Sequence, residues 1–275
     1  MKPVLVIPLD IITALNIRGY RFVIKIRDIA DLQKAIEIAH NDRQCISIMC
    51  DFNNIDIVSL LKMEVMSSRH IYINCSFSGN ILSLTKALYS DVNVNDFASV
   101  TFLLPANTPN IVTLLKILSS CGIKSGLQLI SDNIINKDDF EELATYSYLT
   151  PVAHAQIEPF GYILQEVTDK RKYVDLNTYY FNSPDTFVHI EHDGSVLLKS
   201  EFPEFQKVVC SSIEELDRID FSEISMGYKR LRFYNHFDTE DKCSKCPNFK
   251  ICAGYFMNRL DDCKYTLSSI YEMLY

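Results

Sequence analysis

Short runs of apolar, β-branched and aromatic residues alternate along the chain with stretches in which apolar residues recur every three or four positions. The runs are typical of β-strands and the periodic stretches of α-helices. Successive runs begin 24 to 29 residues apart, which is the length of one strand and one helix with their loops. This pattern predicts parallel strands joined by crossover helices. The predicted strands are 21–26, 45–50, 70–75, 99–104, 124–130 and 152–157.

Four segments between these runs predict helices that cover the sheet. In segment 111–120 the apolar residues recur at i, i+3, i+4 and i+7, the stripe that packs against a sheet. Six strand–helix units are too few to close an eight-stranded barrel. We therefore predict an α/β fold with an open, partial (βα) TIM-like barrel of about six units, whose ligand face is at the carboxyl ends of the strands. The predicted helices are 29–40, 81–90, 111–120 and 137–146.

The chain changes character after residue 160. Residues 161–185 have no clean period and mix charged residues with tyrosines, so we interpret them as a linker. Beyond them, two short apolar runs flank Asp193-Gly194, a dipeptide that favours a tight hairpin turn. The predicted organisation is a partial barrel over 1–160, the linker, and a small cysteine-rich domain over 186–275.

Three helices are predicted after the hairpin. Ser212 and Glu215 have the spacing of a capping box that opens a short helix, and a second helix is predicted over 222–232. The C-terminal segment carries one apolar stripe, which we expect to dock on the body of the protein. The stripe consists of Leu267, Ile270, Tyr271 and Leu274.

Composition and charge exclude several classes of function. The chain is 48% hydrophobic and 23% charged, as expected of a folded domain, and none of its 8 glycines forms a dinucleotide-binding fingerprint or a P-loop. A net charge of -8 disfavours contact with nucleic acid. The apolar runs are shorter than the roughly 20 residues of a membrane span, and the N-terminus lacks the apolar core of a signal peptide. We therefore expect a cytoplasmic protein without nucleic-acid or membrane partners.

Four of the nine cysteines crowd into residues 243–263 with the spacing C-x2-C-x5-C-x10-C. In a reducing compartment such a cluster indicates a metal site more often than disulfides. Four thiolates suit either an all-cysteine zinc site or an iron–sulfur cluster, although structural zinc usually takes two C-x2-C pairs and this segment has one. Cationic residues that would offset the thiolate charge surround them. The cysteines are Cys243, Cys246, Cys252 and Cys263, and the cations are Lys242, Lys245, Lys250 and Arg259.

Polar residues at the expected strand ends are the other candidates for chemistry, but no nucleophile, base and orienting group share a spacing that a mechanism requires. Cys45 and Cys50 lie five apart on one strand, so we expect them on opposite faces as buried structural thiols. The H-x2-H pair of His189 and His192 is also expected to point to opposite faces of a strand, without a shared metal. The strand-end candidates are Cys50 with Asp51 and Asn53, Cys75 with Ser76, Asp132, and His154 with Glu158.

The cysteine-rich segment resembles the SPASM domain, the C-terminal auxiliary-cluster domain of radical SAM peptide maturases. The core pattern of that domain is C-x2-C-x5-C-x3-C followed by one more cysteine. Here Cys243, Cys246 and Cys252 match the first three, Phe256 replaces the fourth, and Cys263 matches the last.

The resemblance implies which cluster could be retained. In the SPASM domain the first three cysteines and the last bind one [4Fe-4S] cluster, whereas the fourth belongs to another cluster with three cysteines near the hairpin. In this chain Phe256 removes the fourth, and residues 188–205 contain no cysteine. The resemblance therefore implies that one cluster site is lost and that one complete site remains.

The βα units resemble the partial barrel of radical SAM enzymes, yet their C-x3-C-x2-C motif is absent and no SAM is expected. The chain thus resembles the pseudo-radical-SAM proteins that accompany true maturases in Bacteroidales peptide-modification systems. This resemblance implies a non-catalytic accessory protein that binds a precursor peptide or a radical SAM maturase and holds one [4Fe-4S] cluster for structure or electron transfer. Two alternatives stay open: a zinc-stapled interaction protein, and an enzyme that uses Asp51, His154 or Glu158.

Overall fold

The computed structural model has an α/β fold built on a mostly parallel sheet. Neighbouring strands follow the order β10-β9-β8-β1-β2-β3-β4-β5-β6-β7. The chain divides into two compact units, Met1–Cys50 with Asp175–Lys245 and Asp51–Val174 with Cys246–Tyr275. The structure describes residues 2–12, 17, 19–90, 92–129, 134–168, 174–199, 206–237, 243, 246–252, 255–256, 260 and 262–274.

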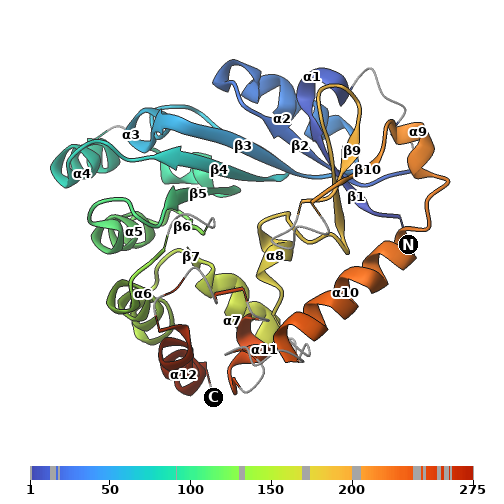
Figure 1. Ribbon diagram of the computed structural model, residues 1–275. Helices are drawn as coiled ribbons and strands as arrows, with labels where there is room; N and C mark the ends of the chain where they lie inside the picture. Colours follow the sequence, from blue (N-terminus) through green and yellow to red (C-terminus); the bar gives the residue numbers. More distant parts are fainter. Residues whose placement is uncertain are drawn as a thin grey trace. The chain divides into compact units, whose positions relative to one another are not determined.

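In the first unit, strands β1, β2, β8 and the beginning of β3 run parallel, and β9 and β10 continue antiparallel (Figure 1). Helix α2 contacts β2 through its apolar face, as the periodicity of 29–40 predicts. The strands are β1 (Val4–Pro8), β2 (Phe22–Ile26), β3 (Cys45–Asp56), β8 (Phe187–Ile190), β9 (Val196–Leu197) and β10 (Val208–Cys210). The helices are α1 (Leu9–Ile12), the 3-10 turn η1 (Ile29–Asp31), α2 (Leu32–Asn41), α8 (Leu176–Tyr179), α9 (Ile213–Leu216) and α10 (Phe221–Phe237).

Strand β1 is a feature that the sequence pattern did not predict as a strand. It pairs with β2 on one side and with β8 on the other. All five of its residues are buried, so the segment has no alternation of polar and apolar positions by which a strand is recognised. With β1 and β8 the parallel part of the sheet has more strands than the six that were predicted.

The predicted hairpin is confirmed. Strands β8 and β9 pair antiparallel, with His189 opposite Leu197 and Ile190 opposite Val196. In the turn Gly194 has a φ of 83°, a left-handed conformation that glycine adopts without steric cost.

The predicted capping box between Ser212 and Glu215 at the start of α9 is wrong. Ser212 precedes the helix, but its side chain makes no capping hydrogen bond. The Glu215 carboxylate instead accepts hydrogen bonds from the backbone N–H (3.0 Å) and the hydroxyl of Ser211. The hydrogen bond from the Glu215 side chain back to the backbone is therefore made with Ser211 and not with Ser212.

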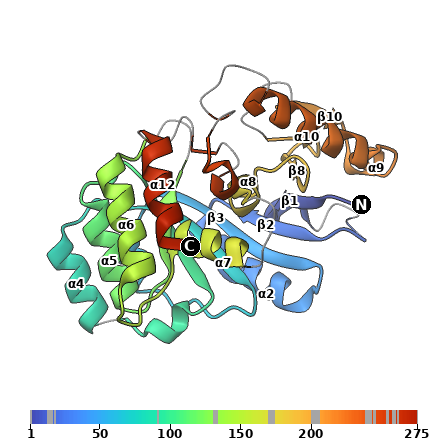
Figure 2. The ribbon, with the colours of Figure 1, turned by 90° about the horizontal axis from the view of Figure 1, so that it is seen from below.

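The second unit contains the end of β3 and four parallel strands covered by helices (Figures 1 and 2). Residues along β4 alternate between fully buried apolar positions and partly exposed polar ones. The strands are β4 (His70–Ser76), β5 (Val100–Pro105), β6 (Ser125–Gln128) and β7 (Ile157–Glu158). The helices are α3 (Ile57–Leu60), α4 (Ile81–Ser90), the 3-10 turn η2 (Val94–Phe97), α5 (Ile111–Ser120), α6 (Lys137–Leu149), α7 (Phe160–Thr168), α11 (Phe249–Cys252) and α12 (Cys263–Leu274).

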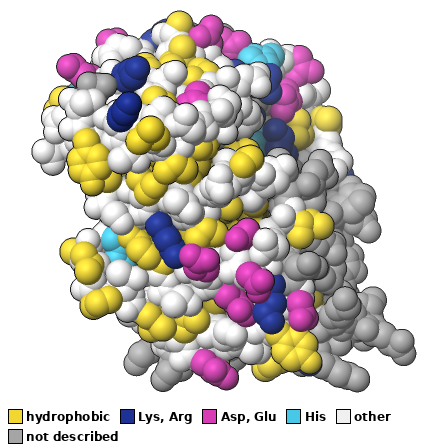
Figure 3. Space-filling model, turned by 90° about the vertical axis from the view of Figure 1, so that its left-hand side faces the viewer, with side chains coloured by type: hydrophobic (Ala, Val, Ile, Leu, Met, Phe, Trp, Pro, Cys, Tyr) yellow, Lys and Arg dark blue, Asp and Glu magenta, His cyan; other side chains and the backbone are white. Residues whose placement is uncertain are grey.

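The helices predicted over 81–90, 111–120 and 137–146 are confirmed as α4, α5 and α6. Part of the segment interpreted as a linker is helical. It contains α8 and all but the first residue of α7, and these helices bury Ile163, Leu176 and Tyr179. Outside this core, single hydrophobic side chains such as Leu82 and Tyr89 of α4 are exposed, and Figure 3 shows hydrophobic and charged side chains interspersed over one face. Among the described residues, no helix has both the length and the apolar character needed to cross a bilayer.

Candidate metal centre and strand-end residues

The four clustered cysteines are divided between the two units. Cys243 belongs to the first, whereas Cys246, Cys252 and Cys263 belong to the second. Cys252 is the last residue of α11 and Cys263 the first of α12. Cys243 and Cys252 are buried, Cys246 and Cys263 are partly exposed, and none of the nine cysteines forms a disulfide.

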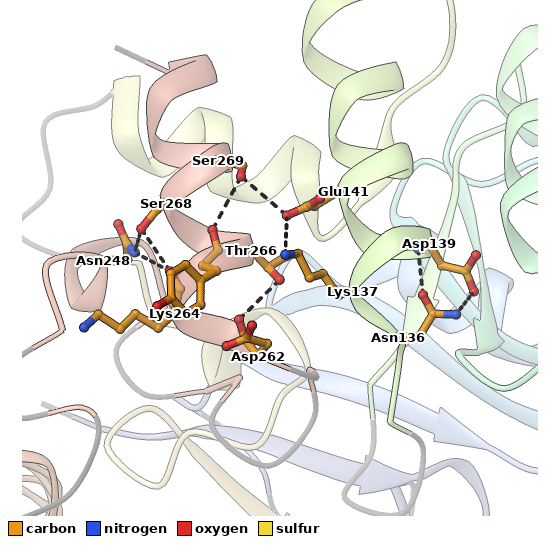
Figure 4. A network of polar contacts seen from close by, with 11 residues as sticks. Asn136, Lys137, Asp139, Glu141, Asn248, Asp262, Lys264, Thr266, Ser268 and Ser269 are labelled. Carbon is orange, nitrogen blue, oxygen red and sulfur yellow. Dashed lines mark hydrogen bonds and ion pairs between the residues drawn. The ribbon is translucent and has the colours of Figure 1, made fainter.

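A buried amide holds the segment around Cys246 and Cys252 against the start of α12. The side-chain amide of Asn248 donates to the carbonyl oxygen of Lys264 (2.9 Å) and to the hydroxyl of Ser268 (2.8 Å), and only 2% of Asn248 is exposed (Figure 4). Lys264 directly follows Cys263 in the chain. The two hydrogen bonds therefore join the backbone near three of the four cysteines.

Two aromatic residues attach the same segment to the rest of the second unit. The hydroxyl of Tyr255 donates to the carbonyl oxygen of Leu129 at 2.8 Å. Phe256 is fully buried, and its ring meets that of Phe140 on α6 edge-on at a centroid distance of 5.0 Å. At the position where the SPASM pattern has its fourth cysteine, an aromatic side chain thus fills a packed space.

The C-terminal helix docks on α6, and the two helices lie side by side in Figures 1 and 2. Leu267 and Ile270 are buried, as predicted, but Tyr271 is 39% exposed, so the apolar stripe is narrower than expected. The hydroxyl of Ser269 donates to the Glu141 carboxylate at 3.4 Å (Figure 4). This docking fixes the helix whose first residue is Cys263.

The donor set of the cysteines and their described geometry differ in how well they suit a metal. Four thiols are the donor set that suits zinc or an iron–sulfur cluster. In the part of the chain that the structure describes, however, no three histidine, cysteine, aspartate or glutamate side chains are arranged as ligands of one ion. By their chemistry, the candidate ligands are Cys243, Cys246, Cys252 and Cys263, but the described geometry does not gather three of them around one ion. The cations Lys242, Lys245 and Arg259, the side chain of Lys250, and Asp132 lie outside the described residues.

Strand β3 is longer than predicted and continues to Asp56, so Asp51 and Asn53, which were expected at its end, lie within the strand. Both take part in local polar contacts. The carboxylate of Asp51 accepts hydrogen bonds from the side-chain amides of Asn53 (3.0 Å) and of Asn74 on β4 (3.3 Å). At the end of β3, Asp56 accepts hydrogen bonds from the backbone N–H groups of Ser78 (2.7 Å) and Val58 (2.9 Å). Burial raises the pKa of Asp56, but these hydrogen bonds outweigh it and hold the pKa below its usual value.

Among the described residues of the second unit, Glu158 is the carboxyl group whose pKa burial raises above its usual value. Burial raises its pKa to about 7, although the N–H of Tyr162 donates to the carboxylate at 2.9 Å and Lys124 adds positive charge. Burial and this carboxylate together raise the pKa of Tyr72 to about 12. A buried acid that titrates near neutrality is a recognised feature of functional sites. The sequence pattern identified Glu158 but neither Lys124 nor Tyr72. These two residues are distant from Glu158 in the chain, and nothing in the local sequence shows that their charges interact with it.

His154 does not lie with Glu158 at a strand end, and that expectation is wrong. Strand β7 contains only Ile157 and Glu158, so His154 precedes it. The neighbouring Ala155 N–H donates to the carbonyl oxygen of Ser119 in the last turn of α5 (2.9 Å), which puts this segment at the amino end of the strands. The His154 ring lies 4.8 Å from that of Tyr146.

The two histidines near the hairpin have separate surroundings. His189 on β8 is buried, and its Nε2 donates to the carbonyl oxygen of Phe181 at 2.9 Å. Burial, with contributions from Lys199 and Lys25, lowers the pKa of His189 to about 3. His192 is in the turn, and its Nδ1 contacts the carboxylate of Asp10 at 2.8 Å.

No family model, curated protein or solved structure matches the chain.

Proposed function

We propose that the chain is a non-catalytic iron–sulfur accessory protein of ribosomal peptide maturation, of the pseudo-radical-SAM kind. It binds a precursor peptide or a radical SAM maturase in the cytoplasm. It holds one [4Fe-4S] cluster through Cys243, Cys246, Cys252 and Cys263, in a reduced SPASM-like domain.

The observation that carries the proposal is the attachment of the cysteine-rich segment. Asn248 joins the backbone next to Cys246 and Cys263 through two buried hydrogen bonds, and this arrangement suits a segment that supplies several ligands to one cluster. Phe256, which replaces the remaining cysteine of the SPASM pattern, is fully buried. A packed phenylalanine there is consistent with the loss of one cluster site and the retention of the other.

The strand order supports a degenerate barrel. Strands β1 to β7 are neighbours in chain order, and the parallel strand β8 lies beside β1. This is the neighbour order of the strands in a (βα) barrel. We propose that the sheet derives from a TIM-like radical SAM barrel and no longer binds SAM.

Four cysteine ligands would leave no open coordination position on a bound metal. The metal would then serve the structure or electron transfer and would not act as a Lewis acid. Zinc in the same site would make the protein a structural interaction module without redox activity.

The proposal is tested by measuring iron, zinc and acid-labile sulfide in protein purified without oxygen. We expect about four iron and four sulfide per chain. Cys243→Ala and Cys263→Ala should abolish both, whereas Cys121→Ser, a change outside the segment, should leave them unchanged. One zinc without sulfide would support the zinc-stapled alternative. Protein that binds neither metal under these conditions would overturn the proposed centre.

A second candidate function, an enzyme with a site on the strands of the second unit, is favoured by Glu158. Its carboxyl group has a pKa of about 7, so it could accept or donate a proton at neutral pH. The test is product formation in a reconstituted maturation reaction. A loss of product with Glu158→Gln, but not with the exposed control Glu142→Gln, would favour the enzyme over the accessory protein.

A further inference from the structure

Strand β7 is the last strand of the sheet in neighbour order, and it leads into α7 (Figure 1). It has only two residues, and its partner among the described strands is β6, with Ser125 opposite Ile157 and Gly126 opposite Glu158. Such a short edge strand has few backbone hydrogen bonds to lose. It is therefore a part of the sheet that can open locally without unfolding of the whole unit.

The side chain of Glu158 joins this strand to the helix that follows it. Only 9% of the residue is exposed, and its Oε2 accepts the N–H of Tyr162 in the first turn of α7 at 2.9 Å. A Cβ atom at Gly161 would lie 3.1 Å from its Oε1, and one at Gly126 would lie 2.6 Å from its Cβ. The side chain is thus enclosed by the backbone of β6 and of α7. Full hydration of the carboxyl group requires β7 or the first turn of α7 to move.

An ionised Glu158 has little to compensate its charge. Among the described residues no cation forms an ion pair with it, and Lys124 acts on it only through its charge. The other titratable groups that interact with it are Tyr72 of β4 and Tyr148 of α6, and burial raises the pKa of both, so they are neutral at pH 7. Glu166, the other buried carboxylate of α7, lies eight residues further along the chain. A buried carboxylate without a paired cation favours any state in which water reaches it.

We propose that the protonation state of Glu158 controls a local opening of the second unit, in which β7 and the first turn of α7 separate from β6 and α6. In the open state the carboxyl group is in water and has its ordinary pKa of 4.5, whereas in the closed state its pKa is about 7. Each pH unit between these values therefore favours opening about tenfold, which gives about 300-fold over the whole window. The opening does not depend on the proposed metal centre.

Contacts of Phe160, the first residue of α7, keep the open state a minor one. Its ring is fully buried against that of Phe140 at a centroid distance of 4.9 Å, and its carbonyl oxygen accepts the hydroxyl of Tyr148 at 3.1 Å. Ionisation of Glu158 weakens the attachment of this segment without removing these contacts. The opening is therefore measured best by amide hydrogen exchange, which detects rarely populated open states.

Exchange is followed in the full chain between pH 4.5 and 8, with correction for the intrinsic pH dependence of amide exchange. The reporter is Ile163, whose N–H donates to the Pro159 carbonyl oxygen at 2.9 Å, and the reference is the buried Leu118 of α5. We expect the protection of Ile163 to fall by up to about 300-fold over this range. It should also be at least about tenfold lower than that of Leu118 and less sensitive to urea, because local opening exposes less surface than unfolding.

Three results would overturn the proposal. The first is a protection of Ile163 that does not change with pH. The second is an Ile163 that matches Leu118 in protection and in urea sensitivity, because global unfolding alone would then expose Glu158. The third is a ¹³Cδ resonance of Glu158 that titrates at the ordinary pKa of a glutamate, because the closed state would then carry no penalty for the charge.

Substitutions test whether Glu158 is the responsible group. Glu158→Gln keeps an acceptor for the Tyr162 N–H but cannot ionise, so the protection of Ile163 should no longer depend on pH. Glu142→Gln removes an exposed carboxylate of α6 and should leave the pH dependence intact. A folded Glu158→Gln protein that keeps the pH dependence contradicts the proposal. If that variant does not fold, the comparison of Ile163 with Leu118 and the Glu158 resonance in the parent protein decide.

Discussion

Gly126 on β6 pairs with Glu158 on β7 so closely that a Cβ atom at residue 126 would lie 2.6 Å from the Glu158 carbonyl oxygen. The clash would be with backbone, which cannot swing aside as the end of a flexible side chain can. Gly126→Ala must therefore shift β7 or break its pairing, and we expect a loss of roughly 1 to 3 kcal/mol in the free energy of unfolding.

Urea unfolding measures this loss. Gly79→Ala is the matched control, because its new Cβ would meet chiefly the hydroxyl of Ser83 at 3.1 Å, a group that can rotate. A Gly126→Ala protein as stable as the Gly79→Ala protein would contradict the close approach of the two strands.

The raised pKa of Glu158 makes stability depend on pH. The carboxyl group titrates at about 7 in the folded chain and at 4.5 when unperturbed, so the folded state binds more protons between these values. Stability should accordingly fall as the pH rises from 4.5 through 7. The fully developed cost of the buried charge above that window is about 3 kcal/mol.

Glu158→Gln keeps an acceptor for the Tyr162 N–H and removes the charge. We expect it to be more stable than the parent protein at pH 8 and similar at pH 4.5, with a flatter pH profile in urea unfolding. Glu142→Gln, at an exposed residue that pairs with Lys116 at 2.5 Å, should leave the profile unchanged. A parent protein whose stability is constant across this window would contradict the raised pKa.

Helices α4 and α5 could be predicted closely because each has an apolar stripe of period 3.6 that its packing requires. Helices α4 and α5 occupy the predicted ranges 81–90 and 111–120. Two strands were harder to predict, because β1 is buried at every position and β7 has only two residues. Neither leaves an alternating pattern from which its position can be read.

A shift of register in β3 places Cys45 and Cys50 differently from the prediction. Cys45 and Cys50 were predicted on opposite faces of their strand, five residues apart. Their partners on β2, Phe22 and Ile26, are four apart, because the register shifts by one residue in β3 after Cys45. The two thiols therefore share a face, and the error arises from a local irregularity that the alternation of residue types does not encode.

The candidate metal centre was predictable only as a set of residues. The spacing of the four cysteines is a property of the sequence, but their attachment depends on Asn248 and Tyr255, which act on residues distant in the chain. A polar or aromatic residue gives no sign of such a contact before the fold is known.

The two hydrogen bonds of Asn248 predict that this side chain secures α12. Asn248→Ala removes two hydrogen bonds, one to the Ser268 hydroxyl and one to the Lys264 carbonyl, which keeps its bond from the Ser268 hydroxyl (2.9 Å). We expect a loss of about 2 kcal/mol in the free energy of unfolding. Hydrogen exchange should accelerate in the first turns of α12. Ser269→Ala, which removes only the long hydrogen bonds of this hydroxyl to Glu141 and to the Tyr265 carbonyl (3.4 Å each), is the control and should have little effect. Unchanged exchange in Asn248→Ala would contradict the attachment.

Substitutions of Phe256 distinguish the contribution of packing to stability from the binding of metal. Its buried ring contacts Phe140, so Phe256→Cys should destabilise the protein by about 3 kcal/mol through the lost contacts and the cavity. If the centre is the retained cluster, this extra thiol should not raise the iron content, because residues 188–205 supply none of the other cysteines that a second cluster would need. Phe256→Leu, which fills more of the space, should cost less stability at equal iron content. Iron rising towards eight per chain in Phe256→Cys would contradict the inference that only one cluster site remains.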